Sequence, residues 1–301
     1  MEKRVLITGS TGLIGTELKD LLGKEGYTIN ELSRRKLDHE NTFQWDIREG
    51  KLDIEALNGV STIVHLAGAG VADEKWTEKR KKELFDSRID STKLLYQSLK
   101  DNPGHGVKTL VCASAIGFYG FDRGSELVEE DSLPGNDFLA EITKAWEKEA
   151  KMFEELGIRV VNVRIGIVLS TEGGALVEII KPVKLMAGAA LGSGKQYMSW
   201  IHIRDMAGII QYAIENESLQ GPYNAVAPNP EANKELTRTL ASVMSKPFFL
   251  PNVPGFVLKT LLGDMAVLVL GGLKVSSEKI IQAGYSFKYP DLREALEDLI
   301  N

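Results

Sequence analysis

The sequence predicts an α/β protein with a doubly wound parallel sheet and a smaller α/β carboxy-terminal region. Apolar, β-branched segments alternate with amphipathic segments, as in parallel strands connected by helices. The apolar segments are 4–8, 27–32, 62–66, 109–113 and 159–164, and the amphipathic segments include 13–22 and 87–99. Pairs such as Val160-Val161 are apolar on consecutive residues, which is typical of strands covered by helices on both faces. A glycine-rich turn after the first strand completes a Rossmann-type pattern.

The glycine-rich turn reads TGSTGLIG at residues 8–15, and apolar residues at helical spacing begin at Leu13. Glycines let the backbone turn tightly and approach a pyrophosphate. The amino terminus of the following helix adds free N–H groups and the positive end of its dipole. Glycines also serve ordinary turns, but the order of strand, glycine turn and helix favours a dinucleotide-binding site.

The end of the second strand indicates which dinucleotide is bound. A site that prefers NAD places an acidic residue there to hold the ribose 2′-hydroxyl. This strand ends in Leu32-Ser33-Arg34-Arg35, and guanidinium groups make forked, charge-assisted bonds to phosphate. Glu31 is the alternative acid, but it lies inside the strand, two residues before the expected turn. We therefore expect NADP(H), with ordinary loop charges as the alternative interpretation of the two arginines.

Composition argues against several other classes of protein. The 301 residues are 43% hydrophobic with a formal net charge of -6, so the basic footprint of a nucleic-acid-binding protein is missing. The short basic run at 79–82 is followed by acids and is expected on a solvated helix face. Cys112, the single cysteine, lies in an apolar segment and is expected to be a buried, inert thiol. We expect no metal site, no membrane segment and a cytoplasmic location.

The regular alternation loosens after residue 166, where glycines and prolines become frequent. The apolar stretch 253–273 contains Lys259 and Asp264, which would be costly in a bilayer, so a pair of helices packed on the protein is expected. We predict a dinucleotide-binding domain over 1–166, with a sheet completed by segments around 195–228. A smaller, substrate-facing domain is predicted over 167–301, with its final section at 248–301.

Several later motifs follow the same order as those of a known superfamily. They include HLAGA at 65–69, SAIGFYG at 114–120, RIGIVL at 164–169 and WIHIRD at 200–205. With TGSTGLIG, they make the chain similar to the extended short-chain dehydrogenase/reductases. The closing section, with Pro251, Pro254 and GYSFKYP at 284–290, resembles the carboxy-terminal domain of the branch called epimerase family proteins.

The resemblance implies a cofactor site position by position. The glycine turn would hold the pyrophosphate, the arginines the 2′-phosphate, Asp46 and Ile47 the adenine, and the Ala-Gly-Ala run the nicotinamide-side ribose. The implied cofactor residues are Gly9, Thr11, Gly12, Leu13, Ile14, Gly15, Ser33, Arg34, Arg35, Asp46, Ile47, Ala67, Gly68, Ala69 and Arg164. Two of these assignments have an alternative interpretation. Asp46 would only start a turn, and the Ala-Gly-Ala run would only allow a helix to pack closely.

Redox members of the superfamily use a serine, a tyrosine and a lysine four residues after the tyrosine. The lysine lowers the tyrosine pKa so that the phenolate can take a hydroxyl proton. Ser114 fits the serine position, but Leu139 and Thr143 stand at the tyrosine and lysine positions. Lys144 is one residue off, a rotation of about 100° on a helix.

Other side chains could replace the missing acid and base. Tyr119 follows Ser114 closely in sequence, with a structural role as the alternative, and Glu141 is a second candidate, with an exposed helix acid as the alternative. We therefore predict Ser114 and Tyr119 as catalytic residues.

The resemblance also implies residues that bind a second ligand between the two domains. Aromatic and cationic groups there would hold a phosphorylated or sugar-like compound. These residues are Trp76, Arg88, Lys195, Gln196, Trp200 and His202, and Arg164 also lies near this space. Core aromatics and structural ion pairs are the alternative interpretation.

Two hypotheses for function follow. The first is an NADP(H)-binding epimerase or oxidoreductase that acts on a small hydroxyl or carbonyl compound, with a sugar nucleotide as one example. The second is a non-catalytic NADPH-binding sensor or regulatory module, which the missing tyrosine and lysine favour. We expect a small-molecule ligand, no nucleic acid, no membrane and a homodimer.

Overall fold

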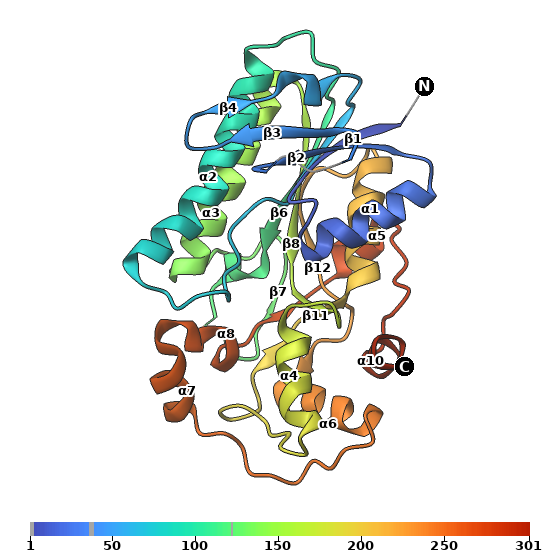
Figure 1. Ribbon diagram of the computed structural model, residues 1–301. Helices are drawn as coiled ribbons and strands as arrows, with labels where there is room; N and C mark the ends of the chain where they lie inside the picture. The colour runs from blue at the N-terminus through green and yellow to red at the C-terminus, as the bar shows by residue number, and fades with distance from the viewer. Residues whose placement is uncertain (1–2, 36–38, 122) are drawn as a thin grey trace.

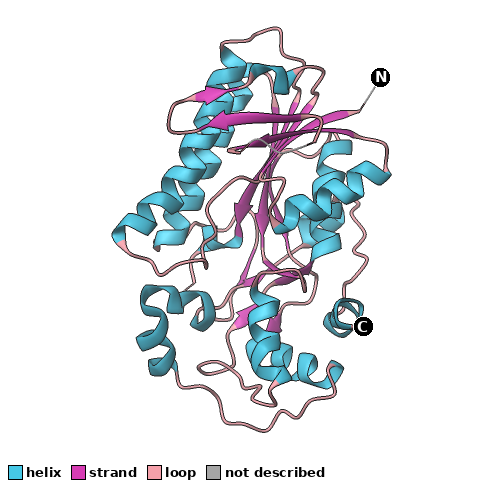
Figure 2. Ribbon diagram, in the orientation of Figure 1, coloured by secondary structure: helices cyan, strands magenta, loops and turns pink. Residues whose placement is uncertain are grey.

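A twisted, mostly parallel sheet forms the centre of the structure (Figure 1 and Figure 2). The computed structural model describes residues 3–35, 39–121 and 123–301, and within them the sheet has eight strands in the order β12-β8-β6-β5-β1-β2-β3-β4. The strands are β1 (Arg4–Thr8), β2 (Thr28–Ser33), β3 (Thr42–Asp46), β4 (Lys51–Leu52), β5 (Thr62–His65), β6 (Thr109–Ala115), β8 (Arg159–Ile165) and β12 (Gly221–Ala225). All neighbours are parallel except β4, which runs antiparallel to β3. The predicted fold class is confirmed.

Helices cover both faces of this sheet (Figure 1). On one face α2 (Glu78–Lys100) lies beside α3 (Phe138–Lys151), and on the other α1 (Leu13–Lys24) lies beside α5 (Ile203–Glu215). Each pair buries its own apolar cluster against the strands, with Leu99 and Trp146 in one and Leu18 and Ile210 in the other. Burial of such side chains, at roughly 25 cal/mol per Å² of apolar surface, holds the three layers together.

The order of the strands reverses direction between β1 and β5. From β1 the chain proceeds to β2 and β3 on one side, and then to β5, β6 and β8 on the other. In open parallel sheets, ligands bind at this switch point, beyond the carboxyl ends of the strands. The ends of β1 and β5, at Thr8 and His65, therefore mark the expected cofactor site.

The carboxy-terminal elements form a smaller layer with its own core. Helices α4 (Ala175–Lys184), α6 (Asn233–Val243) and α10 (Leu292–Ile300) pack around Trp200 and Tyr289. Two-stranded ladders pair β9 (Ile167–Leu169) with β11 (Trp200–His202), β10 (Tyr197–Met198) with β13 (Glu231–Ala232), and β7 (Leu127–Val128) with β14 (Lys274–Val275). The remaining elements are α7 (Gly255–Leu262), α8 (Val267–Leu270), α9 (Glu278–Gln282) and the 3-10 turns η1 (Ile54–Leu57), η2 (Ile116–Tyr119), η3 (Met152–Leu156) and η4 (Gly263–Ala266).

Strand β12 follows α4, a helix of the carboxy-terminal layer, in sequence and yet completes the main sheet beside β8. The division at residue 166 stays a prediction. No helix in the described part of the chain combines the length and apolar character needed to cross a membrane.

Three expectations need correction. Strand β2 covers Thr28–Ser33 and thus lies one residue later than predicted. Arg80, in the basic run expected to be solvated, is only 6% exposed. It lies one helical turn before the buried Leu84, and its guanidinium donates hydrogen bonds to the Gly70 carbonyl and to Glu83. Helix α2 also begins before residue 87, where the amphipathic pattern predicted its start. The Thr77 hydroxyl accepts a hydrogen bond from the Arg80 amide and so caps the helix at this earlier position.

Candidate functional site

The glycine turn between β1 and α1 has the geometry that a pyrophosphate requires. Gly9 has a φ of +70°, and a Cβ there would lie 2.8 Å from the Leu66 carbonyl carbon. A Cβ on Gly15 would overlap the carbonyl oxygen of Gly9, so this glycine permits the close approach of helix and strand. A Cβ on Gly12 would lie within 4 Å only of the Gly9 oxygen, at 3.3 Å, which leaves the turn open for a ligand.

The amino terminus of α1 is unencumbered. Gly12 is the cap residue, no side chain caps the helix, and no acid lies in its first turn. The first amides of the helix and its dipole therefore remain for an anion. The predicted residues Thr11, Leu13 and Ile14 lie around this helix start.

Beyond β2, Arg34 and Arg35 are exposed. Among the described residues, no carboxylate lies within 4.0 Å of either guanidinium. Ser33 accepts a hydrogen bond from the Arg35 amide at 3.2 Å, which shapes this turn. Glu31 is buried, and its Oε2 accepts from the Lys19 ammonium at 2.9 Å. Its charge is therefore matched within the protein, and the strand end presents cations and a hydroxyl.

Asp46 ends β3, and its carboxylate accepts from the amides of Arg48 and Glu49 at 2.9 and 3.1 Å. This is the turn-forming arrangement that was the alternative interpretation of Asp46. Ile47 packs against the apolar cluster under α2 and α3. Their contacts with an adenine stay a prediction.

A buried hydrogen-bonded chain joins the glycine turn to the Ala-Gly-Ala run. The Thr8 hydroxyl accepts from the Ala67 amide at 3.1 Å and lies 2.7 Å from His65 Nδ1. Since that hydroxyl oxygen already accepts from backbone, its own proton goes to Nδ1. Nε2 therefore carries the imidazole hydrogen, which it donates to Thr92 Oγ1 at 3.0 Å.

The neutral form of His65 satisfies every partner in this chain. Burial, and secondarily the charge of Arg88, lowers the pKa of His65 to about 3. The histidine is thus a structural connector that fixes the ends of β1 and β5 relative to α2, and not an acid or base at neutral pH.

Arg88 lies directly below the Ala-Gly-Ala run. Its Nη1 donates to the carbonyls of Ala69 and Leu84 at 3.1 and 3.0 Å, and its Cζ lies 5.2 Å from the Trp146 ring centre. A Cβ on Gly68 would lie 3.2 Å from that Cζ. Burial lowers the Arg88 pKa to about 10, helped by the nearby Arg80. The guanidinium thus supports the Ala-Gly-Ala run from beneath.

Ser114 and Arg164 meet on Glu147 at the carboxyl ends of β6 and β8. The Ser114 hydroxyl donates to Glu147 Oε1 at 2.6 Å, and Arg164 makes a two-pronged ion pair with the same carboxylate at 2.8 and 2.9 Å. Arg164 also stacks on Phe118, with its Cζ 3.6 Å from the ring centre. Only 3% of Arg164 is exposed. Its guanidinium is committed to protein partners, and its contact with a cofactor stays a prediction.

Tyr119 is fully buried next to this ion pair. Its hydroxyl accepts from Arg164 Nη1 at 2.9 Å and donates to Asn224 Oδ1 at 2.6 Å. Burial raises the pKa of Tyr119 to about 12, although Arg164 opposes the shift. This location gives the phenol no direct path to a ligand, and its proton-transfer role stays a prediction.

The face of α3 that carries the acid and base in redox relatives is apolar here. Leu139 lies over Gly117, where a Cβ would be 3.3 Å from the Leu139 Cβ. Thr143 is buried and donates back to the Leu139 carbonyl at 2.8 Å. Lys144 reaches the Gly135 carbonyl at 3.2 Å, and Glu141 is exposed. These four side chains therefore do not reproduce the tyrosine and lysine pair of the redox relatives.

Of the predicted second-ligand residues, Trp200 and His202 are both 0% exposed. The Trp200 indole donates to the Asn229 carbonyl at 2.9 Å. His202 stacks on Tyr289 at 3.9 Å between ring centres, and its Nε2 lies 3.2 Å from Asp298. Burial lowers the His202 pKa to about 4, partly offset by Asp298. Both residues secure α10, and the structure does not bring them to a cavity.

Two more of the predicted residues, Lys195 and Gln196, lie in the loop before β10. Gln196 donates to the carbonyls of Leu191 and Val269, both at 2.9 Å, and so joins this loop to α8. Lys195 is exposed. Contacts of these residues with a ligand stay predictions.

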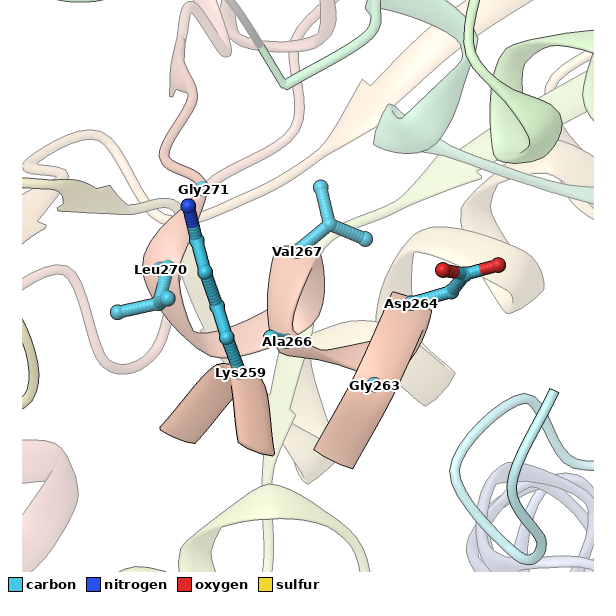
Figure 3. Close-up of a pocket in the computed structure, with 7 residues that line it drawn as sticks. All are labelled: Lys259, Gly263, Asp264, Ala266, Val267, Leu270 and Gly271. Carbon is cyan, nitrogen blue, oxygen red and sulfur yellow. The ribbon is translucent and has the colours of Figure 1, made fainter. Parts of the chain in front are cut away.

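Trp76 does line a cavity, together with residues that were not predicted to bind a ligand. The cavity has a volume of about 220 Å³ and is lined by Trp76, Lys81, Asp137, Phe138, Leu139, Asp264 and Val267. A second cavity of about 510 Å³ shares Asp264 and Val267 and continues along α7 and α8 (Figure 3). The ion pair between Lys81 and Asp264, at 2.8 Å, connects α2 to this carboxy-terminal segment.

Comparison with known proteins places the chain in a family. Residues 5–226 match the NAD dependent epimerase/dehydratase family. The chain belongs to this family. Residues 253–299 match a domain of unknown function, DUF1731, as the resemblance of the closing section implied.

Individual relatives agree with that assignment. The Epimerase family protein YfhF of Bacillus subtilis is 38% identical over 303 residues, which cover 98% of this chain and 97% of YfhF. The crystal structure of the human epimerase family protein SDR39U1 with NADPH is 30% identical, with a TM-score of 0.86 and coverage of 98% of both chains. A nucleoside-diphosphate sugar epimerase from Corynebacterium glutamicum is 29% identical with a TM-score of 0.81, covering 100% of this chain and 58% of that one. The chain is therefore an NAD(P)-binding member of the epimerase family.

Proposed function

We propose that this epimerase family protein binds NADP(H) in preference to NAD(H) and uses it to oxidise or reduce a small hydroxyl or carbonyl compound. The observation that carries the cofactor choice is the exposed Arg34-Arg35 pair beyond β2, free of carboxylates among the described residues, next to a Glu31 already bound to Lys19. A 2′-phosphate would supply the missing negative charge. The NADPH bound to the human relative is consistent with this preference.

The bound nicotinamide would supply the hydride acceptor or donor. The residues of this chain would position it: the glycine turn and α1 the pyrophosphate, Arg34 and Arg35 the 2′-phosphate, and the Thr8–His65 chain the loop beneath the ribose. Ser114 is only 2% exposed and donates its proton to Glu147, so in this proposal it would act by holding that carboxylate at the end of β6. Tyr119 fits a positioning role, because it holds Arg164, which in turn holds Glu147.

A non-catalytic NADPH-binding regulator is the second candidate. Leu139 and Thr143 on α3 favour it, because neither side chain can move a proton at neutral pH. Mass spectrometry of small molecules released by denaturing the purified protein separates the two. NADP(H) recovered with a carbonyl or hydroxyl compound supports the enzyme, and NADP(H) alone supports the regulator.

The cofactor preference is tested with Arg34→Asp. We expect the Kd for NADPH to rise about 10- to 100-fold, since charge-assisted hydrogen bonds contribute about 1.5–3 kcal/mol, while the Kd for NADH changes little. Titration of nucleotide fluorescence measures both. The matched control is Arg293→Asp, the same change at an exposed position of α10. Equal losses of NADPH and NADH affinity would contradict the assignment of Arg34 to the 2′-phosphate.

A further inference from the structure

The cavity beside α3 is lined mainly by apolar side chains from separate parts of the chain. Trp76 precedes α2, Phe138 and Leu139 begin α3, and Val267 begins α8. The rings of Trp76 and Phe138 meet edge to face, 5.3 Å between centres. The Trp76 indole N–H is already used by the Val71 carbonyl, at 2.8 Å, so the ring offers the cavity apolar surface.

This cavity lies near the edge of the sheet where we propose that the cofactor binds. Leu139 packs over Gly117, which follows β6 by two residues, and the carboxyl ends of β6, β5 and β1 share one edge of the sheet. Leu139 also holds the position that a catalytic tyrosine has in redox relatives. An apolar residue at this position makes the wall nearest the cofactor unable to hydrogen-bond to a sugar.

The charged groups that line the cavity are bound to the protein itself. Lys81 pairs with Asp264 at 2.8 Å and donates to Glu78 at 3.2 Å. Asp137 caps α3, accepting from the Ala140 amide at 2.9 Å with one oxygen and from the Phe121 amide at 3.0 Å with the other. These bonds balance the charges without a ligand.

Four arginines on elements around this cavity have protein partners as well. Arg80 donates to the Gly70 carbonyl and Glu83, and Arg123 donates to the carbonyls of Tyr119 and Leu133. Arg88 and Arg164 are held as described above. A nucleoside diphosphate needs cations to compensate two phosphates. Arg123 and Arg164 use all three guanidinium nitrogens for protein partners and would first have to give up these bonds.

The adjoining cavity is also lined mainly by apolar residues. Figure 3 shows Lys259 extending past Leu270 toward Gly271, while Asp264 points away from it. Ala266, Val267 and Leu270 supply its apolar surface. Lys259 is the single cation that lines it, and one ammonium does not match the charge of a diphosphate.

We propose that the second ligand of this protein is an apolar, ring-bearing carbonyl or hydroxyl compound held between Trp76, Phe138, Leu139 and Val267, and not a nucleoside diphosphate sugar. This inference rests on the proposed oxidoreductase function and narrows its substrate class. A cavity of about 150 Å³ accepts benzene, so one of about 220 Å³ has room for a substituted or fused ring. Longer ligands would extend over α8 into the adjoining cavity.

The test is a calorimetric titration of the NADP⁺-loaded protein with 2-acetonaphthone and, separately, with UDP-glucose. We expect 2-acetonaphthone to bind at least tenfold more tightly than UDP-glucose. Val267→Asp, which places a carboxylate in the wall, and Trp76→Ala, which removes a wall, are each expected to weaken 2-acetonaphthone binding at least tenfold. Leu185→Asp, at a residue that is 77% exposed outside the cavity, is the matched control for Val267→Asp and should leave binding unchanged.

Three results would overturn the inference: tighter binding of UDP-glucose, no binding of 2-acetonaphthone up to its solubility limit, or binding unchanged by both cavity variants. Circular dichroism and thermal unfolding verify that each variant is folded, and Trp76→Ala serves if Val267→Asp is not. The Kd for NADP⁺ is measured first, by itself. A protein that fails to bind NADP⁺ contradicts the proposed function, and titration of the nucleotide-free protein then still tests the cavity.

Discussion

The Thr8–His65 chain gives a quantitative prediction, because a single hydroxyl serves two buried partners. Thr8→Val keeps the shape of the side chain and removes the hydroxyl. The Ala67 amide then loses its acceptor, and His65 Nδ1 loses its donor. The Leu66 amide keeps the Thr8 carbonyl at 3.2 Å and does not add to the loss. At about 1–3 kcal/mol for each of these two groups, we expect the free energy of unfolding to fall by about 2–6 kcal/mol.

Urea unfolding at pH 7.5, followed by far-ultraviolet circular dichroism, measures this loss. Thr260→Val is the matched control, since the Thr260 hydroxyl lies on the exposed side of α7 and donates only to the Phe256 carbonyl. It should change stability by less than about 0.5 kcal/mol. The affinity for NADPH should fall with Thr8→Val as well, because Ala67 begins the loop that we propose to lie beneath the ribose. If Thr8→Val lowers the free energy of unfolding no more than Thr260→Val does, the structural role assigned to the Thr8–His65 hydrogen bonds is refuted.

Three further predictions concern acid, the glycine turn and the buried ion pair. Folding lowers the pKa of His65 to about 3 and that of His202 to about 4, so below about pH 6.5 the unfolded chain binds more protons than the folded protein. Between pH 7.5 and pH 5 the free energy of unfolding should therefore fall by about 2 kcal/mol for each histidine. Urea midpoints that stay flat from pH 7.5 to 5 would exclude this. Gly15→Ala should weaken NADPH binding and stability together, because its Cβ would overlap the Gly9 carbonyl; nucleotide titration and thermal unfolding check both. Glu147→Gln should lower the free energy of unfolding, measured in urea, by about 3–5 kcal/mol, because it leaves the Arg164 guanidinium buried without its counter-charge. A loss of less than about 1 kcal/mol would contradict this role.

The sequence predicted the sheet and the cofactor turn because those signals are local. Strands such as β6 and β8 are buried on both faces and therefore read as apolar runs, and the glycine turn follows β1 without interruption. Strand β3 was missed because it is only partly buried near the edge of the sheet, where its residues alternate between apolar and polar. The family resemblance, drawn from motifs spread along the whole chain, was confirmed.

The second-ligand region was less predictable, because it depends on contacts between distant segments. Trp200 and His202 lie in a motif that follows the family order, but only the folded chain shows that both are turned into the core around α10. The ion pair between Lys81 and Asp264 joins positions 183 residues apart. One signal was available: an aspartate inside the apolar stretch 253–273 indicated a polar partner elsewhere in the protein.

The placement of β12 at the edge of the main sheet has a consequence during synthesis. Strand β8 ends at Ile165, but the strand that pairs with its outer side is not complete until Ala225. At about 5–20 residues per second, the ribosome would need on the order of 3–12 s to deliver it. During that interval β8 presents unpaired backbone groups to other nascent chains, the kind of edge on which aggregation starts. A ribosome-associated chaperone that shields this segment would therefore be expected to raise the yield of folded protein.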